Sequence, residues 1–211
     1  MENYKKINEV IIVDYGMGNL SSIRNIVNKA GGKCKISSKI SDVLNAKKLI
    51  LPGVGSFDSG MQNLIDSGLL VALNKCVLEK QIPILGICLG AQLMTKSSEE
   101  GILSGFGWFD ARTERFQLDQ TLDYKIPHMG WNRIKIKKNH PIFANTPCES
   151  RFYFVHSYHF TTNVENISLC SSNYCYEFVS GLAKDNIIAL QFHPEKSHNF
   201  GFEVMKQFVT L

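Results

Sequence analysis

Cys88 lies in a segment that could present a reactive thiol. Residues 86–90 read Gly-Ile-Cys-Leu-Gly, which is the spacing of a nucleophile elbow with cysteine in the nucleophile's position. A nucleophile at the tip of a strand-to-helix turn is strained and closely surrounded by backbone, and the two glycines leave the room that this needs. We expect Cys88 to lie at a helix N-terminus, where free N–H groups lower the pKa of a thiol. The amide of Leu89 could then help to bind an oxyanion.

A candidate base and its carboxylate stand near the end of the chain. Residues 191–197 read Gln-Phe-His-Pro-Glu-Lys-Ser and follow an apolar run. Proline restricts the residue before it to extended geometry, and in an extended segment residues two apart project to the same side. His193 and Glu195 should therefore converge, with the carboxylate orienting the imidazole. With Cys88 they would form a nucleophile, base and orienter for acyl transfer.

Each of these features also has an ordinary structural interpretation. A single cysteine in an apolar run is usually a small buried hydrophobe, and the chain has six cysteines. His193 and Glu195 could equally be a surface histidine and a solvated carboxylate. Taken together the features favour catalysis, because both follow predicted strands and would lie on the same rim of a sheet.

The first half of the chain alternates between predicted strands and helices. Ser21 or Ser22 can cap a helix that ends at Gly31-Gly32, and another helix is predicted over 69–80. Short apolar runs predict strands at 10–14, 33–36, 48–51 and 82–87. This alternation implies an α/β fold with a mostly parallel central sheet and helices on both faces. Ligand sites in such sheets form beyond the carboxyl ends of the strands.

Two glycine-rich turns fall at that edge besides the elbow. Residues 16–18 read Gly-Met-Gly, but Ser21 stands where a dinucleotide-binding fingerprint needs its third glycine, and no acidic residue ends the second strand. We therefore expect no cofactor. Residues 52–55 read Pro-Gly-Val-Gly, and the backbone around Gly53 and Val54 could supply a second oxyanion donor. The alternative is a plain tight turn.

The second half of the chain is rich in short β-branched and aromatic runs. Strands are predicted at 108–116, 131–136, 151–155, 168–171, 177–179 and 187–191. They fit an extension of the central sheet plus an additional antiparallel layer. A helix over 200–211 would close a single domain spanning residues 1–211.

Two loops of this half carry residues that could contact a ligand or a protein. His156 and His159 have nearly a metal spacing, but no cysteine or carboxylate stands nearby at ligand spacing, so we favour a structural or substrate-contacting loop over a metal site. The apolar segment 125–132 either covers the core or, where Met129 and Trp131 are exposed, forms a protein contact surface.

The composition is that of an ordinary globular chain. Its 211 residues are 44% hydrophobic with a formal net charge of +4, an excess too small to indicate a nucleic-acid site. No apolar segment approaches the about 20 residues that span a membrane. The polar residues 1–6 do not read as a signal peptide. The cysteines form no Cys-x-x-Cys pair and are interpreted as reduced thiols of a cytoplasmic protein.

Taken together, these motifs resemble the class I, or triad-type, glutamine amidotransferases. The elbow with Gln92, the 193–195 segment and the 52–55 loop carry this resemblance. Further motifs narrow it to the glutaminase subunits of imidazole glycerol phosphate synthase, from histidine biosynthesis. These motifs are residues 14–19, 128–132 and 191–197. The resemblance covers nearly the whole chain.

The resemblance implies roles for individual residues. Cys88 would attack the side-chain amide of L-glutamine and form a γ-glutamyl thioester, His193 would carry the protons, and Glu195 would orient His193. The oxyanion hole would comprise backbone amides of Gly53, Val54 and Leu89. The residues implied in holding glutamine are Gly55, Gln92, Ser157 and Tyr158. Those implied in facing a partner are Asn19, Met129, Trp131 and Lys196.

The resemblance also implies a heterodimer without a metal or other cofactor. The partner would be a cyclase subunit of the (β/α)8-barrel type, and glutaminase activity would stay low until that partner is bound and loaded. Ammonia in water is mostly protonated near neutral pH, and ammonium has no lone pair with which to attack. The ammonia should therefore reach the partner along an enclosed path.

Departures from the pattern leave the acceptor open. Residues 56–61 and 196–202 resemble paralogues that supply ammonia for the amidation of surface-polysaccharide sugars. A stand-alone hydrolase of γ-glutamyl peptides and a non-catalytic binding module are further alternatives. The complete set of Cys88, His193 and Glu195 argues against the binding module.

Overall fold

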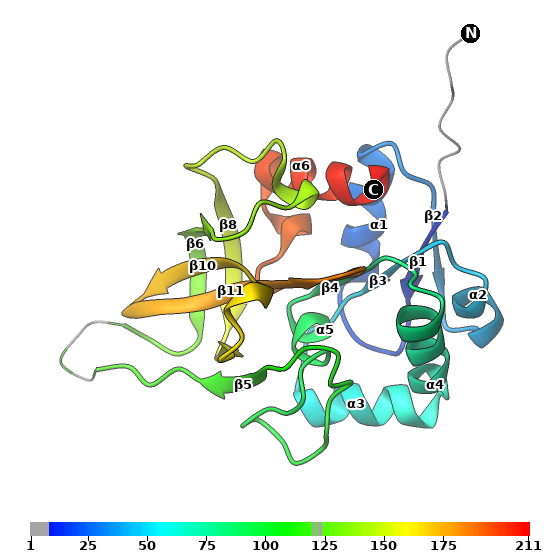
Figure 1. The fold of residues 1–211 in the computed structure, drawn as a ribbon, viewed down its shortest axis with the longest axis horizontal. Coiled ribbons are helices and arrows are strands. Elements are labelled where there is room, and N and C mark those ends of the chain that lie inside the picture. The colour runs from blue at the N-terminus through cyan, green and yellow to red at the C-terminus, as the bar shows by residue number, and fades with distance from the viewer. Residues whose placement is uncertain (1–8, 120, 122–123) are drawn as a thin grey trace, which may run out of the picture.

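A computed structural model describes residues 9–119, 121 and 124–211. The polar stretch at residues 1–6, considered above for a signal peptide, lies outside the described residues. Helices and parallel strands form one part of the molecule, and a lobe of antiparallel strands extends from it (Figure 1).

The helical part is built on five parallel strands. These are β1 (Val10–Val13), β2 (Cys34–Ser37), β3 (Lys48–Leu51), β4 (Ile84–Ile87) and β12 (Ile187–Leu190). Their order in the sheet is β2-β1-β3-β4-β12. Every residue of β1, β3, β4 and β12 is buried. Burial on both faces explains why these segments are nearly continuous apolar runs rather than alternating patterns.

Antiparallel strands continue the sheet beyond β12. They are β11 (Tyr176–Lys184), β10 (Ser168–Tyr174), β7 (Lys135–Ile136), β9 (Tyr158–Thr161) and β5 (Arg112–Arg115). β11 pairs with β12 and β10, β10 pairs with β7, and β9 joins β11 to β5. A separate two-stranded sheet pairs β6 (His128–Arg133) with β8 (Arg151–His156). The predicted sheet extension with an added antiparallel layer is confirmed.

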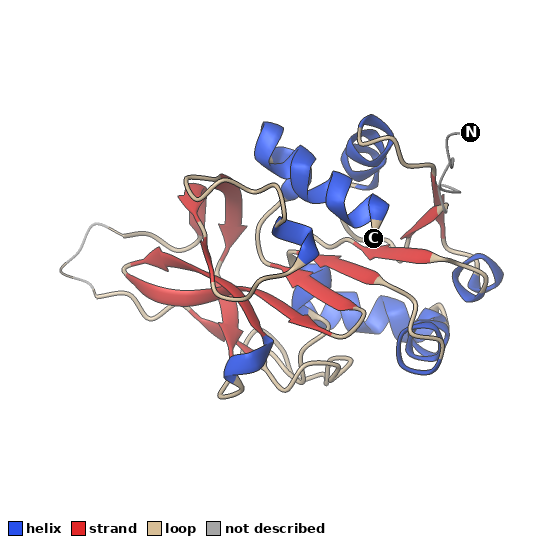
Figure 2. Cartoon of the chain, turned by 45° about the horizontal axis from the view of Figure 1, so that its top comes forward, coloured by secondary structure: helices blue, strands red, loops and turns tan. Residues whose placement is uncertain are grey.

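Helices cover both faces of the parallel strands (Figures 1 and 2). The α-helices are α1 (Leu20–Lys29), α2 (Ile40–Leu44), α3 (Phe57–Asp66), α4 (Leu69–Asn74), α5 (Leu89–Gln92) and α6 (His198–Thr210). Side chains alternate along β1, so that Val10 and Ile12 pack with α1 and α6, whereas Ile11 and Val13 pack with α3 and α4. No helix within the described ranges has the length and apolar character needed to cross a membrane.

The predicted cap of one helix is wrong, and another predicted helix changes its hydrogen-bond pattern along its length. Helix α1 is capped by Asn19, whose side chain accepts a hydrogen bond from the Ser22 amide at 3.1 Å, rather than by Ser21 or Ser22. Asparagine caps a helix about as well as serine. The helix predicted over 69–80 changes at Asn74 into a π-helical turn.

Some observed elements are not predicted from the sequence, and one predicted strand is split between two sheets. Helices α2 and α3 and strand β9 are not predicted from the sequence. Helix α3 has apolar residues at helical spacing, but Ser59 and Gly60 interrupt its first turns and weaken the signal. The single strand predicted over 131–136 is split at the buried Ile134 between β6 and β7, which belong to different sheets.

Candidate active site

Cys88 occupies the turn between β4 and α5. Its backbone has φ 53° and ψ −113°, a conformation that residues with a Cβ rarely adopt. A Cβ on Gly90 would lie 2.0 Å from the carbonyl oxygen of Leu51 in β3, so only glycine fits there. The strained turn expected from the spacing is therefore present. The helix is shorter than expected, since α5 has four residues, and its dipole supports a thiolate less than that of a long helix would.

The His193 imidazole is fixed by Glu195. Nδ1 of His193 lies 2.7 Å from Oε1 of Glu195, and the two side chains are 1% and 3% exposed. Because the carboxylate accepts from Nδ1–H, Nε2 is the ring nitrogen left to take up a proton. The expected convergence is confirmed, but the fully extended segment is not. His193 is extended, whereas Pro194–Lys196 form a 3-10 turn that brings the carboxylate back to the ring.

Ser197 and strand β8 support this histidine. The amide of His193 donates to the carbonyl of Tyr153 at 2.9 Å. The buried Ser197 hydroxyl accepts from the Tyr153 amide at 3.0 Å and donates to the carbonyl of His193 at 2.5 Å. The imidazole is thus carried on a rigid connection between β8 and the turn. Sequence reasoning assigns Ser197 no role, because a serine after Pro-Glu-Lys has no local signature of such a bridge.

The sheet brings Cys88 and His193 to the same edge. Strands β4 and β12 are parallel neighbours with Ile87 opposite Leu190, so the segments that follow them leave the sheet together. Burial lowers the pKa of His193, but the charged form of Cys88 and the Glu195 carboxylate outweigh burial and raise this pKa to about 10. Among the described residues, Nε2 of His193 is buried and has no hydrogen-bond partner within normal geometry. The arrangement suits proton transfer between sulfur and imidazole.

A cavity of about 240 Å³ opens beside Cys88. Nine residues predicted for the site line it, namely Val54, Gly55, Cys88, Leu89, Gln92, Ser157, Tyr158, His193 and Lys196. Four further lining residues are not among the predicted site residues, namely Glu100, Pro127, Val155 and His156. Glu100 is the only carboxylate among the described lining residues, and it accepts from the Phe57 amide at 2.8 Å. No local motif marks Glu100 in the sequence.

The 52–55 loop is locked against the elbow. A Cβ on Gly53 would lie 2.4 Å from the amide nitrogen of Gly90, so the two segments touch through backbone. The Tyr15 hydroxyl donates to the carbonyl of Pro52. Burial, together with the charge of Cys88, raises the pKa of Tyr15, which keeps this phenol protonated as a donor. Tyr15 is thus a further supporting residue that sequence reasoning does not identify.

Gln92 is tied to the wall of the cavity by its amide nitrogen. Nε2 of Gln92 donates to the carbonyl of Tyr158 at 3.1 Å and to Oε1 of Gln191 at 3.0 Å. Nε2 of Gln191 in turn lies 3.8 Å from the sulfur of Cys88. Both hydrogens of the Gln92 amide are therefore used, and its carbonyl oxygen is the atom that it can offer a ligand.

Comparison with known proteins identifies the family. The family model described as Glutamine amidotransferase class-I matches residues 11–210. The chain belongs to the class-I glutamine amidotransferases. This amidotransferase is 45% identical to Imidazole glycerol phosphate synthase subunit HisH 2 of Pseudomonas aeruginosa, over 96% of this chain and 99% of the relative. It is 48% identical to the subunit of the same name from Methanococcus maripaludis, over 95% and 98%.

Solved structures share the fold of this amidotransferase. A putative GMP synthase subunit from Thermoplasma acidophilum matches with a TM-score of 0.72 at 22% identity, over 98% of this chain and 94% of that one. PurLQS from Thermotoga maritima matches with a TM-score of 0.74 at 14% identity, over 96% and 97%. These likenesses confirm the predicted α/β fold class.

The residues predicted to face a partner lie on the outside of the amidotransferase. On β6, Met129 is 61% exposed and Trp131 46% exposed, and the Trp131 ring stacks on His198 at 5.2 Å. Lys196 is exposed and borders the cavity beside Cys88. Asn19 is also exposed and shares a second depression with Lys196. Met129 and Trp131 are therefore both exposed, as a protein contact surface on this segment requires.

The histidines of the 156–159 segment are held by hydrogen bonds. Nδ1 of His156 lies 2.8 Å from the carbonyl of Tyr158, and Nε2 of His159 lies 3.0 Å from the Tyr176 hydroxyl. Among the residues that the structure describes, no three His, Cys, Asp or Glu side chains gather closely enough to hold a metal ion. These contacts support the structural interpretation of the segment, and His156 also lines the cavity.

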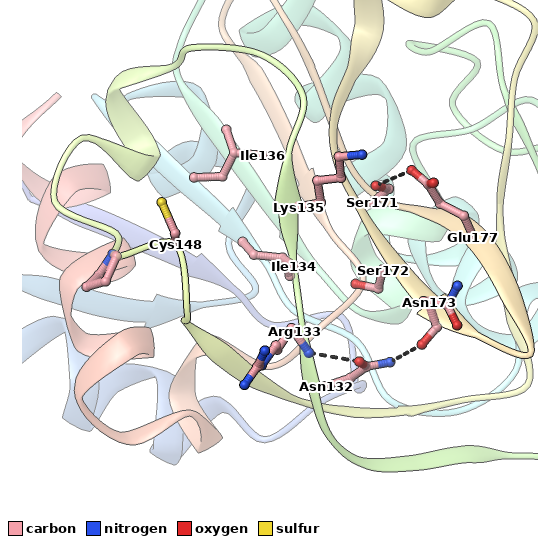
Figure 3. Close-up of a pocket in the computed structure, with 11 residues that line it drawn as sticks. Asn132, Arg133, Ile134, Lys135, Ile136, Cys148, Ser171, Ser172, Asn173 and Glu177 are labelled. Atoms are coloured by element: carbon pink, nitrogen blue, oxygen red, sulfur yellow. Dashed lines mark hydrogen bonds between the residues drawn. The ribbon is translucent and has the colours of Figure 1, made fainter.

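A second cavity, of about 580 Å³, lies beside β6, β7 and β10 (Figure 3). It contains none of the predicted site residues. Its lining includes the exposed thiol of Cys148 and the ion-paired Glu177, but no imidazole. A thiol and an imidazole thus line the cavity at Cys88 together, whereas this second cavity has a thiol without an imidazole.

Proposed function

We propose that this chain is the glutaminase subunit of an imidazole glycerol phosphate synthase and hydrolyses L-glutamine to glutamate and ammonia. The observation that carries the proposal is the buried His193–Glu195 pair beside the strained Cys88, at the mouth of a cavity. The relatives named above, which match nearly the whole chain, are subunits of that synthase.

The first half-reaction makes the thioester. His193 takes the proton of the Cys88 thiol, and the sulfur attacks the side-chain carbonyl carbon of glutamine. The carbon–nitrogen bond then breaks, the imidazolium gives its proton to the leaving nitrogen, and ammonia departs. Glu195 stabilises the imidazolium through Nδ1–H. The raised pKa of His193 suits a ring that holds a proton while the sulfur is negative.

The second half-reaction restores the enzyme. His193, now neutral, removes a proton from a water molecule that attacks the thioester carbonyl. The carbon–sulfur bond breaks, glutamate leaves, and the proton returns from the imidazolium to the sulfur of Cys88. The same base therefore serves both steps.

The oxyanion formed in both steps is assigned to backbone donors. The amide of Leu89 follows the nucleophile directly, and the Gly53–Val54 turn packs against the elbow. The Tyr15 hydroxyl bond to the Pro52 carbonyl fixes the plane of the Pro52–Gly53 peptide, and with it the direction of the Gly53 N–H. Removal of one such donor typically lowers kcat by about 10²- to 10³-fold.

The cavity offers complementary groups for free glutamine. The carbonyl oxygen of Gln92 and the carboxylate of Glu100 suit the α-ammonium group, because both are acceptors on the cavity wall. Gly55, Ser157 and Tyr158 line the remaining wall and are proposed to position the substrate.

The ammonia is proposed to pass to a (β/α)8-barrel cyclase subunit that covers the exposed face bearing Met129 and Trp131. Aromatic residues and methionine are enriched at protein interfaces. Lys196 lines the cavity, and its Nζ lies 5.7 Å from the centre of the Tyr153 ring, which in turn lies 6.1 Å from the Trp131 ring. All six cysteines are free thiols, as a cysteine nucleophile needs, so we place the reaction in the reducing cytoplasm. The comparisons do not favour sugar amidation or a stand-alone hydrolase, because the relatives carry the synthase name.

Ammonia release from glutamine, measured with and without the cognate cyclase and its substrate, tests the proposal. We expect release to rise with the loaded partner and to be abolished by Cys88→Ala. The matched control is Cys148→Ala, an exposed cysteine outside the cavity, which should retain wild-type activity. Full activity of Cys88→Ala would overturn the mechanism. Equal activity with and without the partner would instead indicate a stand-alone hydrolase.

A further inference from the structure

A line of hydrogen bonds runs through the β-rich lobe toward the cavity. Nδ2 of Asn132 lies 3.2 Å from Nε2 of His128, and Nδ1 of His128 lies 2.9 Å from Nε2 of His156. Nδ1 of His156 lies 2.8 Å from the carbonyl oxygen of Tyr158. The pairing of β6 with β8 sets His128 opposite His156, and the two histidines are only 3% and 5% exposed.

Both ends of this line require the same direction of donation. The Asn132 amide is oriented by two other bonds (Figure 3), since its Oδ1 accepts from a backbone amide at 2.8 Å and its Nδ2 donates to the carbonyl of Asn173 at 2.8 Å. Nδ2 can therefore only donate to Nε2 of His128. At the other end the carbonyl of Tyr158 can only accept. Both imidazoles must then be neutral with the hydrogen on Nδ1.

The surroundings keep these rings neutral. Burial lowers the pKa of His128 to about 4. Burial is also the main cause that holds the pKa of His156 well below its usual range. The His128 ring is stacked between Phe154 and Tyr174, with ring centroids 4.9 and 4.1 Å away. The direction of the line is therefore preserved at physiological pH.

The inner end of the line fixes part of the cavity. The Tyr158 carbonyl receives two hydrogen bonds, one from His156 and one from Nε2 of Gln92 at 3.1 Å. The chain bends at Ser157, between β8 and the first residue of β9, Tyr158, and both residues line the cavity with Gln92. Rotation of this peptide would therefore displace groups proposed to hold glutamine.

The outer end of the line belongs to the strand that carries the exposed face. Along β6, His128 points inward and Met129 and Trp131 are exposed, as alternation along a strand requires. A protein that docks on Met129 and Trp131 and shifts β6 must also shift His128 and Asn132. The hydrogen bonds then transmit that shift to Tyr158.

We propose that His128 and His156 are positioning residues that couple the partner-facing strand β6 to the glutamine-binding bend at Tyr158 and to Gln92. This inference rests on the proposed function, because it takes glutamine for the ligand and the cyclase for the protein on β6. Neither histidine exchanges a proton with the substrate. Their contribution is to fix the Tyr158 peptide in one orientation.

Two substitutions at His128 test the coupling in the complex with the cyclase. His128→Phe keeps an aromatic ring but removes the donor, so the KM for glutamine should rise roughly tenfold, as expected for loss of one buried hydrogen bond, with a smaller change in kcat. His128→Asn retains a donor near the position of Nδ1 and should restore most of the KM. The matched control is His159→Phe, a buried neighbour outside the line, which should leave KM near wild type. Equal KM values for His128→Phe and wild type would overturn the inference.

The tautomers are measured on the wild-type chain by ¹⁵N–¹H correlation of the histidine rings. We expect a protonated Nδ1 and an unprotonated Nε2 for both His128 and His156. A hydrogen on Nε2 of either ring would break the line and refute the proposal, whether or not any variant folds. Absence of glutaminase activity in the wild-type complex would instead sink the proposed function, while the tautomer result would stand on its own.

Discussion

Glu195→Gln tests whether the carboxylate orients and charges the base. The side chain is 3% exposed and its Oε1 lies 2.7 Å from Nδ1 of His193, so the amide fits the same space without the charge. With about 4 Å between charge centres and an effective dielectric constant of about 20, the carboxylate attracts an imidazolium by about 4 kcal/mol. A neutral amide oxygen retains part of this as an ordinary hydrogen bond. We therefore expect the imidazolium of His193 to lose about 3–4 kcal/mol of stabilisation when the carboxylate charge is removed.

This loss falls on the steps in which His193 is protonated. The expected result is a fall in kcat of about 10²- to 10³-fold, since each 1.4 kcal/mol is about a factor of ten. The KM should change little, because Glu195 does not line the cavity. The pKa of His193 should fall from about 10, since burial lowers it and one of the groups that raise it is gone. Steady-state ammonia release in the partner complex and NMR titration of the ring measure these effects.

Glu149→Gln is the matched control for the loss of a carboxylate. The Glu149 side chain is 72% exposed and pairs with Arg133 at 2.8 Å, and such surface pairs contribute little. Its kcat should equal that of the wild type. If Glu195→Gln kept more than about a tenth of the wild-type kcat, a loss below about 1.4 kcal/mol, the orienting role would be refuted.

Three further substitutions probe other parts of the site. Cys88→Ser removes the sulfur whose interaction with the ring raises the pKa of His193, so this pKa should fall from about 10 in an NMR titration, and an unchanged value would exclude an interaction between the two side chains. Gly90→Ala places a Cβ 2.0 Å from the Leu51 carbonyl and should lower the free energy of unfolding in urea by about 2 kcal/mol or more; a wild-type midpoint would contradict this packing. Trp131→Ala should weaken binding of the cyclase by about 2 kcal/mol in calorimetry, whereas unchanged affinity would place the interface elsewhere.

The accuracy of the sequence-based prediction differs between elements for physical reasons. Strands such as β3 are recovered because burial on both faces selects continuous apolar runs. Helix α3 is not recovered because Ser59 and Gly60 weaken its local pattern, and packing against the core stabilises it instead. The switch of residues 131–136 between two sheets depends on pairing partners far away in the chain, which no local pattern contains.

In the candidate site too, residues that act through long-range contacts are not recognisable from the local sequence. Glu100 and Ser197 have no local motif, since their importance comes from the Phe57 amide and the Tyr153 amide that they contact. Gln191 lies within a recognised segment, but its bond to Gln92 is visible only when the two strands are assembled. Long-range contacts of this kind are set by the packing of the whole chain.

The groups that can react are recognisable from short stretches of the chain. Glycine spacing around Cys88 is a local steric requirement, and Pro194 acts on its immediate neighbours, so the elbow and the His193–Glu195 pair can be read from adjacent residues. That these groups meet depends instead on contacts between distant parts of the chain. Parallel pairing of β4 with β12 sets Ile87 opposite Leu190 and delivers thiol and imidazole to one edge. The direction of the line from Asn132 to Tyr158 likewise follows from tertiary contacts, because a hydrogen-bond donor is defined by its partner in space.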